Sequence, residues 1–448
     1  MKFLTQLLST ATALVSVAML SNPAVAQDNT KKADLVPDQQ TMSAIHRVPI
    51  KVSRISENIH MASGIGNVFL IATSEGNVIF DTGIALQSKQ QLDALREAVP
   101  GDVKYTILSH SHADHVGGVQ FLEGSKVVAH REFNEEQRYL KELEPYLWNR
   151  NRTLFPWMPE KPGTVSKKYR YGNVTPDILV DENDFTFNLG GTTFKVLSTP
   201  GGEGADNISL WLPEQKTLLT GDLFGPFFPQ FPNIFTMRGE KVRKPVEYIN
   251  SLDRLIALQP EMILPAHFIA IRNKKEIMTG LTKMRDAVQY VHDSVVDGMN
   301  AGQTVKQLMA DIKLPEALEL TQQHGKVSWA VRSIWEYYAT WFHFKSTTEL
   351  YSTPAESVYQ DLVELAGTDQ LLGKASSYIE RGKVTESIHL LDIVLNTEPN
   401  HKEGNRLYLK AHEILMQQAK QGLRNDYEMH WLRSQIIKAR NVLKNANT

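Results

Sequence analysis

The sequence of 448 residues contains no cysteine. This absence excludes disulfide bonds, thiolate metal ligands and cysteine nucleophiles, so any bound metal must be held by nitrogen and oxygen atoms. The chain also lacks an excess of charge of one sign, because 48 lysine and arginine residues face 50 aspartate and glutamate residues. A net charge of -2 provides no large basic surface for a polyanion, so a nucleic-acid partner is not expected.

A hydrophobic run long enough to cross a bilayer comfortably is also lacking near the N-terminus, where the apolar stretch from Leu7 to Leu20 is short. This stretch follows Lys2 and precedes Ala24-Val25-Ala26, whose small residues are typical of a signal-peptide cleavage site. Residues 1–26 are therefore predicted to be a secretory signal peptide, with an uncleaved anchor as the alternative. We expect a periplasmic or secreted protein without a membrane span after signal cleavage.

The remaining chain has the composition of a globular protein, with 42% hydrophobic and 22% charged residues. Residues 27–45 are polar and predict a flexible lead-in. Residues 46–275 contain two β-rich halves, each followed by helical stretches, which predicts a catalytic domain of stacked sheets with helices outside. The fold class is therefore predicted to be α+β.

The β signal ends near Asn273, and apolar residues then recur three or four positions apart. This spacing predicts one buried helix face, formed by Met284, Ala287, Val288, Val291, Val295, Val296 and Met299. We expect a helical extension of the catalytic domain over residues 276–350 and an all-α domain over residues 351–448. Stripes of this kind are typical of core packing or subunit contact rather than of a cofactor site.

The segment His110-Ser111-His112-Ala113-Asp114-His115 follows a predicted strand over residues 103–108. His110 and His112 are two positions apart, so in an extended backbone they point to the same side. Asp114 and His115 then diverge, which allows them to serve a second centre. Neutral imidazoles and a carboxylate suit zinc or a similar divalent ion. A chance run of polar loop residues is improbable, because three histidines and an aspartate occur within six positions.

This motif resembles the H-x-H-x-D-H signature of the metallo-β-lactamase superfamily, and Phe80-Asp81-Thr82-Gly83 resembles its early strand-end motif. The segment from Pro200 to Asn207, P-G-G-E-G-A-D-N, is similar to the P-G-T-E-A-P-A-E segment of the alkylsulfatase branch, the type III sulfatases, where Glu203 stands in place of a third histidine. Asp222 departs from the glutamate usual in that branch. The resemblance implies an αβ/βα sandwich followed by an all-α helical dimerisation domain.

The resemblance also implies two divalent metal ions, with zinc as the default. One ion would be held by His110, His112 and Glu203. The other would be held by Asp114, His115 and His267, while Asp222 and a hydroxide bridge the pair. Asp222 and Asp114 are the implied catalytic residues.

The segment from Asn233 to Arg243, N-I-F-T-M-R-G-E-K-V-R, resembles the N-x-x-T-x-R-G-A-x-V-R-D segment of the same branch. The resemblance implies that Asn233, Arg238 and Arg243 bind the sulfate group. Arginine suits this role because its planar fork donates to two oxygens of a tetrahedral anion at once. By spacing alone, the two arginines would be interpreted as a solvated surface pair.

The implied function is a dinuclear-metal hydrolase that cleaves sulfate esters, above all alkyl sulfates, with a metal-activated water. A homodimer through the C-terminal helices is expected, without the lipid-carrier-like domain of longer members. Two alternatives stay open, namely another hydrolase on this scaffold acting on a lactone, amide or phosphoester, and a non-catalytic binding protein. Several aromatic residues are expected either to line a channel for an apolar substrate tail or to belong to the core: Trp148, Phe155, Trp157, Phe227, Phe228 and Phe231.

Overall fold

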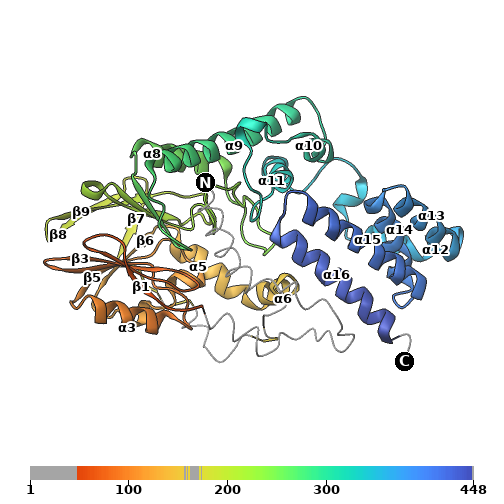
Figure 1. The fold of residues 1–448 in the computed structure, drawn as a ribbon. Helices are drawn as coiled ribbons and strands as arrows, with labels where there is room; N and C mark the ends of the chain where they lie inside the picture. Colours follow the sequence, from red (N-terminus) through yellow and green to blue (C-terminus); the bar gives the residue numbers. More distant parts are fainter. Residues whose placement is uncertain (1–47, 156–157, 159, 162–170, 173, 446–448) are drawn as a thin grey trace. The chain divides into compact units, whose positions relative to one another are not determined.

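A computed structural model describes residues 48–155, 158, 160–161, 171–172 and 174–445 (Figure 1). The predicted signal peptide of residues 1–26 and the predicted lead-in of residues 27–45 lie outside the described residues. The chain divides into two compact units, one ending at Trp335 and the other beginning at Glu336. All candidate site residues belong to the first unit.

The first sheet has seven strands in the order in which they occur along the chain. They are β1 (Val52–Arg54), β2 (Ile59–Ala62), β3 (Val68–Thr73), β4 (Gly76–Phe80), β5 (Val103–Ile107), β6 (Lys126–His130) and β7 (Ile178–Val180). Strands β1 to β4 pair antiparallel, and β4 to β7 pair parallel. The carboxyl ends of β4, β5 and β6 therefore share one edge, where residues that follow these strands can meet.

The second sheet has five strands in the order β12-β11-β10-β9-β8. Their bounds are β8 (Phe185–Leu189), β9 (Thr192–Ser198), β10 (Ile208–Leu212), β11 (Thr217–Gly221) and β12 (Met262–Pro265). Strands β8 to β11 pair antiparallel, and β12 pairs parallel with β11. Because β11 and β12 run the same way, the residues that follow them leave the sheet at one edge.

The two sheets pack face to face through a shared apolar core. Phe69 and Phe80 of the first sheet belong to one buried cluster with Phe194 and Leu210 of the second, and all four are fully buried. On the outer side of the first sheet, α3 (Ser88–Ala98) packs its apolar face against β3 and β4. The predicted sandwich of sheets with helices outside is confirmed.

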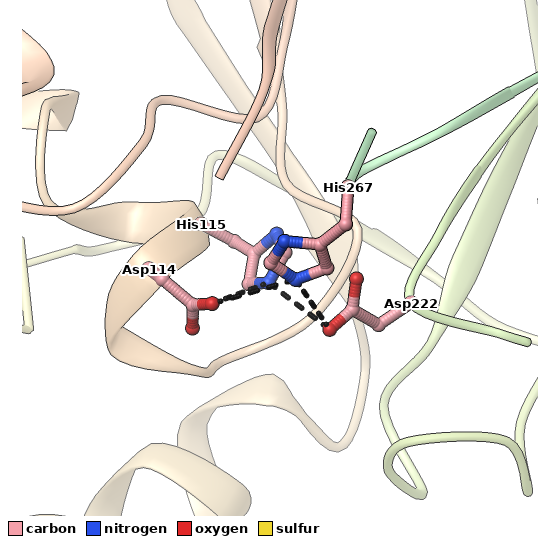
Figure 2. A group of neighbouring side chains, drawn as sticks. All are labelled: Asp114, His115, Asp222 and His267. Atoms are coloured by element: carbon pink, nitrogen blue, oxygen red, sulfur yellow. Dashed lines mark hydrogen bonds and ion pairs between the residues drawn. The ribbon is translucent and has the colours of Figure 1, made fainter. Parts of the chain in front are cut away.

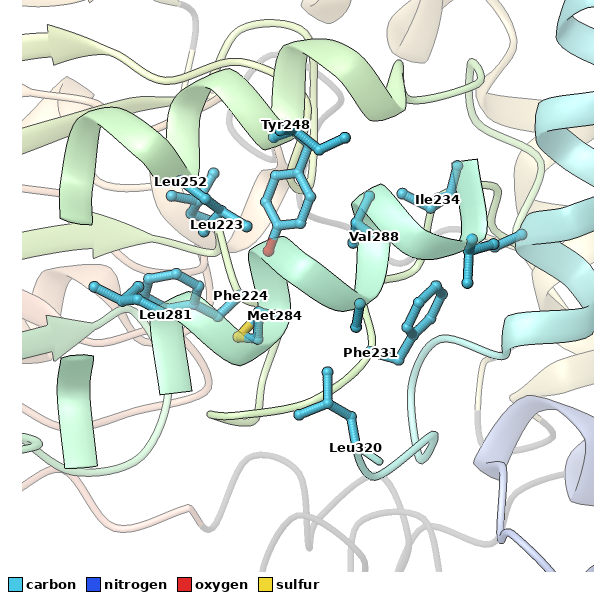
Figure 3. Packing of buried hydrophobic residues seen from close by; sticks show 14 of the residues in the cluster. Leu223, Phe224, Phe231, Ile234, Tyr248, Leu252, Leu281, Met284, Val288 and Leu320 are labelled. Carbon is cyan, nitrogen blue, oxygen red and sulfur yellow. The ribbon is translucent and has the colours of Figure 1, made fainter. Parts of the chain in front are cut away.

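The outer side of the second sheet is covered by α8 (Pro245–Ala257) and α9 (Lys274–Asn300) (Figures 1 and 3). Leu252 of α8 and Met284 of α9 are fully buried in the same cluster as Leu218 of β11. Phe231 is fully buried in this cluster and Phe228 packs against it, so these two aromatic residues belong to the core.

Shorter helices complete the first unit: α4 (Ala113–Val116), α5 (Phe133–Glu142), α6 (Glu144–Leu154), α10 (Val305–Asp311) and α11 (Val327–Ala339), whose assignment runs past the unit boundary at Trp335. The described residues of the second unit contain helices but no strands, and its α-helices are α12 (Tyr359–Ala366), α13 (Thr368–Glu380), α14 (Val384–Thr397), α15 (Lys402–Gln421) and α16 (Asp426–Asn445). Leu391 of α14 and Ala411 of α15 are fully buried in its main cluster. Among the described helices, none is long and apolar enough to cross a membrane.

Candidate metal centre

Four side chains from both sheets converge at one edge of the sandwich (Figure 2). Asp114 and His115 lie in α4, which follows β5, whereas Asp222 follows β11 and His267 follows β12. Each offers one ligand atom within 4.8 Å of the others. Nε2 of His267 lies 3.1 Å from Oδ2 of Asp222, and Nε2 of His115 lies 3.4 Å from Oδ2 of Asp114. This is the predicted second ligand set, joined by the predicted bridging aspartate.

The histidines and aspartates of this group stabilise one another's charged forms. Burial by itself lowers the pKa of His267, but the carboxylates of Asp222 and Asp114 outweigh it and raise that pKa to about 9. Burial also opposes a charged His115, yet Asp114 and Asp222 hold its pKa well above the usual value. Although burial raises the pKa of Asp222, His267 and His115 hold it well below its ordinary range. The carboxylates are therefore ionised and available as anionic ligands.

A second group joins His112, Glu203 and Glu240, with ligand atoms again within 4.8 Å of one another. His112 precedes α4, Glu203 lies between β9 and β10, and Glu240 follows Gly239. Nε2 of His112 lies 3.5 Å from Oε2 of Glu240. Sequence reasoning predicted His112 and Glu203 here but missed Glu240.

His110 lies next to both groups. Its ring centroid is 4.4 Å from that of His112 and 4.3 Å from that of His115. Its Nδ1 lies 3.0 Å from Oγ of Ser109. Burial, and then the neighbouring His115 and His112, lower the pKa of His110 well below its usual value, so the ring is neutral. A neutral imidazole is the form of histidine that binds a metal ion.

A layer of hydrogen bonds orients the histidines. Asp81, at the end of β4, has a positive φ of 56°. Its Oδ1 accepts from the backbone N–H of Ser109 at 2.7 Å, and its Oδ2 lies 3.0 Å from Nδ1 of His115. Nδ1 of His267 lies 2.7 Å from the carbonyl oxygen of Ile65. Both rings thus turn Nε2 toward the carboxylates, the arrangement that supporting hydrogen bonds produce in metal sites.

The predicted anion-binding residues lie beside Glu203. Nη2 of Arg243 donates to Oε2 of Glu203 at 2.6 Å, and Nη2 of Arg238 donates to the same oxygen at 3.1 Å. Nη1 of Arg243 donates to the carbonyl oxygen of Asn233 at 2.6 Å. Only 4% of Arg243 is exposed, so the interpretation of a solvated surface pair is wrong for this residue. Burial raises the pKa of Glu203, but Arg243 above all holds it well below its usual range.

His324 is a second residue that sequence reasoning missed. Its Nε2 lies 3.2 Å from Oε1 of Glu203, although it lies more than a hundred positions further along the chain. It precedes α11 in a segment without any motif that marks it as a site residue. His130, at the end of β6, instead has its Nε2 3.0 Å from Oγ of Ser198 at the end of β9, and we interpret it as a structural histidine that joins the two sheets.

The residues present fit divalent metal ions. Three buried ligand atoms have no hydrogen-bond partner within the described part of the chain: Nε2 of His110, Nε2 of His115 and Oδ1 of Asp222. Leaving such atoms without a partner is costly unless something else binds them. Imidazole nitrogens with carboxylate oxygens form the donor set that zinc and similar ions prefer.

Comparison with known families agrees with this geometry. Residues 62–267 match the family model of the metallo-beta-lactamase superfamily, and residues 304–432 match that of alkyl sulfatase dimerisation. Residues 62–267 therefore form a metallo-β-lactamase domain. The chain combines this domain with an alkyl sulfatase dimerisation domain, and the predicted fold class is confirmed.

The chain is similar to proteins from bacteria and yeast. A linear primary-alkylsulfatase of Pseudomonas sp. is 27% identical over 346 residues, which cover 70% of this chain and 63% of that protein. The alkyl/aryl-sulfatase BDS1 of Saccharomyces cerevisiae is 23% identical over 411 residues, covering 85% and 62%. The solved inverting sec-alkylsulfatase Pisa1 of Pseudomonas sp. shares the fold with a TM-score of 0.74 at 20% identity, covering 92% and 69%. The chain thus spans less than two thirds of the length of these two curated relatives.

Proposed function

We propose that this protein is a dinuclear-metal hydrolase of sulfate esters, with alkyl sulfates as its substrates. The observation that carries the proposal is the pair of guanidinium groups on Glu203, where Arg238 and Arg243 both donate to one oxygen of a candidate metal ligand. This contact puts two anion-binding groups directly beside the metal centre. Hydrolysis of a sulfate ester needs anion-binding groups and a metal centre together, because the anionic oxygens must be held while the ester bond is attacked.

Two bound divalent ions, proposed to be zinc, would supply a water of lowered pKa and would polarise the substrate oxygen. The first would be held by His110, His112 and Glu203. The second would be held by Asp114, His115 and His267, with Asp222 shared between them.

The chain's own residues position the reactants. Asp222 and Asp114 are the proposed catalytic carboxylates, and the buried Oδ1 of Asp222 can accept a hydrogen bond from the attacking water. Arg238 and Arg243 orient the sulfate oxygens with their planar forks. Asn233 adds an amide nitrogen that is buried without a hydrogen-bond partner among the described residues. That donor is available to a substrate oxygen.

The names of the curated relatives favour this function over a lactonase, amidase or phosphoesterase on the same scaffold. Glu203 favours it as well, since its carboxylate takes the position where those branches usually carry histidine. The test is metal analysis combined with a panel of alkyl sulfates, aryl sulfates, lactones and phosphodiesters. We expect two equivalents of zinc and turnover confined to the sulfate esters. Turnover of the lactones or phosphodiesters alone would reject the proposal.

We further propose that the protein forms a homodimer through its C-terminal helices, because residues 304–432 match a dimerisation family. Sedimentation equilibrium of the full chain tests this, and a monomer mass at micromolar concentration would reject it. Export to the periplasm or the medium is likewise a proposal, supported by the pattern of residues 1–26. Sequencing the N-terminus of the mature protein tests it, with Gln27 as the expected first residue.

A further inference from the structure

Glu240 is a partly buried carboxylate that contacts both Arg238 and Arg243, the pair of arginines that forms the proposed sulfate clamp. Its Oε2 accepts from Nη2 of Arg243 at 2.8 Å, and its Oε1 lies 3.1 Å from Nε of Arg238. The same Oε2 lies 3.5 Å from Nε2 of His112, while 12% of the side chain is exposed. Both guanidinium groups that are proposed to hold a substrate sulfate therefore already bind an anion of the protein itself.

The charges around the clamp are balanced without a substrate. Arg238 and Arg243 carry two positive charges, and the carboxylates of Glu203 and Glu240 carry two negative ones. Once Glu203 serves as a metal ligand, Glu240 remains as the anion facing the arginines. A sulfate group that enters the clamp must then compete with Glu240 for the same N–H donors. The sulfate group and the Glu240 carboxylate are both negatively charged, so they repel each other when they bind the same arginines.

Glu240 is a position at which this chain departs from the segment that it resembles. The segment pattern N-x-x-T-x-R-G-A-x-V-R-D has alanine where Glu240 stands, whereas Asn233, Arg238 and Arg243 match it. Gly239 precedes Glu240 with a positive φ of 91°, and this turn brings the side chain back toward Arg238. The protein therefore has both the clamp and a built-in competitor for it.

We propose that Glu240 is a specificity-determining residue that occupies the Arg238–Arg243 clamp and weakens binding of the sulfate group. This inference rests on the proposed function. It assigns to the protein a preference for sulfate esters whose organic part contributes much of the binding, since the anionic group alone meets a competing carboxylate. Inorganic sulfate should accordingly be a weak inhibitor of the wild-type protein.

The test measures binding of inorganic sulfate to the zinc-loaded protein by isothermal titration calorimetry, without any turnover. Glu240→Gln keeps the size of the side chain and removes its charge, so sulfate should bind tighter by on the order of tenfold. Glu240→Ala should also bind inorganic sulfate more tightly, and it should have a lower KM for alkyl sulfates. Glu247→Gln is the matched control, because Glu247 pairs with Lys244 at the start of α8. The affinity of this control variant for sulfate should not change.

Equal or weaker sulfate binding by both Glu240 variants at full zinc content would overturn the inference. Loss of zinc from Glu240→Gln would also overturn it, because Glu240 would then be a metal ligand. If removal of the charge destabilises the fold, added sulfate should raise the Tm of the variant more than that of the wild type, and an equal rise would count against the inference. Absence of alkyl sulfate turnover in the wild type would reject the proposed function instead, while the binding comparison would still be measured.

Discussion

Oδ2 of Asp81 lies 3.0 Å from Nδ1 of His115, and both side chains are fully buried. This contact turns Nε2 of His115 toward Asp114 and Asp222. Asp81 itself is held by the N–H and hydroxyl of Ser109, so the end of β4 and the end of β5 fix one ligand between them. Asp81 is thus a positioning residue for the candidate metal centre.

We predict that Asp81→Asn lowers zinc affinity by about 10- to 100-fold, the usual effect of losing a supporting hydrogen bond to a metal-binding histidine. The amide keeps the size of the carboxylate but removes its charge beside His115. Competition with a chromogenic chelator measures the affinity. Asp93→Asn is the control, since Asp93 forms an exposed pair with Lys89 on α3. Unchanged affinity in Asp81→Asn would show that Asp81 does not orient the ligand.

We predict that Glu203→Gln loses one equivalent of metal and at least about 100-fold of its activity, because a neutral amide is a poor ligand for a divalent ion. Arg238 and Arg243 would also lose a buried charge partner, so thermal unfolding should be followed in parallel. Metal content is measured by mass spectrometry of the dialysed protein. Normal metal content with full activity would contradict the assignment of Glu203 as a ligand.

The metal-free protein should lose stability as the pH rises above neutral. The folded-state pKa of His267 is about 9, above its unfolded value of about 6.5, because Asp222 and Asp114 outweigh the effect of burial. The contribution of this imidazolium is therefore fully present below the unfolded pKa and is lost as the pH rises through the folded one. Urea unfolding after treatment with a chelator, between about pH 7 and about pH 10, measures the free energy of unfolding.

His267→Gln should flatten that pH dependence, which separates His267 from the other groups that titrate in this range. Zinc should reverse the trend, because metal binding requires neutral imidazoles and so strengthens as the pH rises. A wild-type profile as flat as that of the variant would contradict the assigned interaction between His267 and its carboxylates.

We predict that Gly117→Ala destabilises the fold by about 1–3 kcal/mol, the usual effect of overpacking a tight contact. A Cβ atom at this position would overlap the backbone nitrogen of Ala85. Gly117 also donates its N–H to the carbonyl oxygen of Gly83 at 2.9 Å, so the loop cannot easily move away. Thermal unfolding measures the change. Gly373→Ala on α13 is the control, because a Cβ there meets no atom within 4 Å and alanine favours helix.

Local patterns predicted much of the fold and part of the site. The strand over residues 103–108 and the histidines that follow it were recognisable because the spacing of ligands within one loop is a property of the local sequence. The positions of Glu240 and His324 were not predicted. Each reaches Glu203 or His112 only through the packing of the second sheet and its helices. The periodicity of residues along the chain does not indicate which distant loops lie opposite each other in a sandwich.

The burial of Arg243 also could not be predicted from the local sequence. Spacing alone suggested a solvated residue, whereas its burial follows from contacts with Asn233, Glu203 and Glu240 that lie on different loops. The match to a longer segment was therefore more informative than the charge itself. Burial of a charged side chain depends on its partners, and those partners are set by tertiary structure.

The candidate ligands come from segments that leave opposite sheets, with His110 to His115 following β5 and Glu203, Asp222 and His267 following β9, β11 and β12. A metal ion bound by ligands from both sets of segments would cross-link two halves of the domain that are distant along the chain. Clips that close long loops restrict the unfolded chain most, so occupancy would act as a tether against separation of the halves. Chelation should then loosen the whole domain rather than one loop, and protease sensitivity should spread to both halves together.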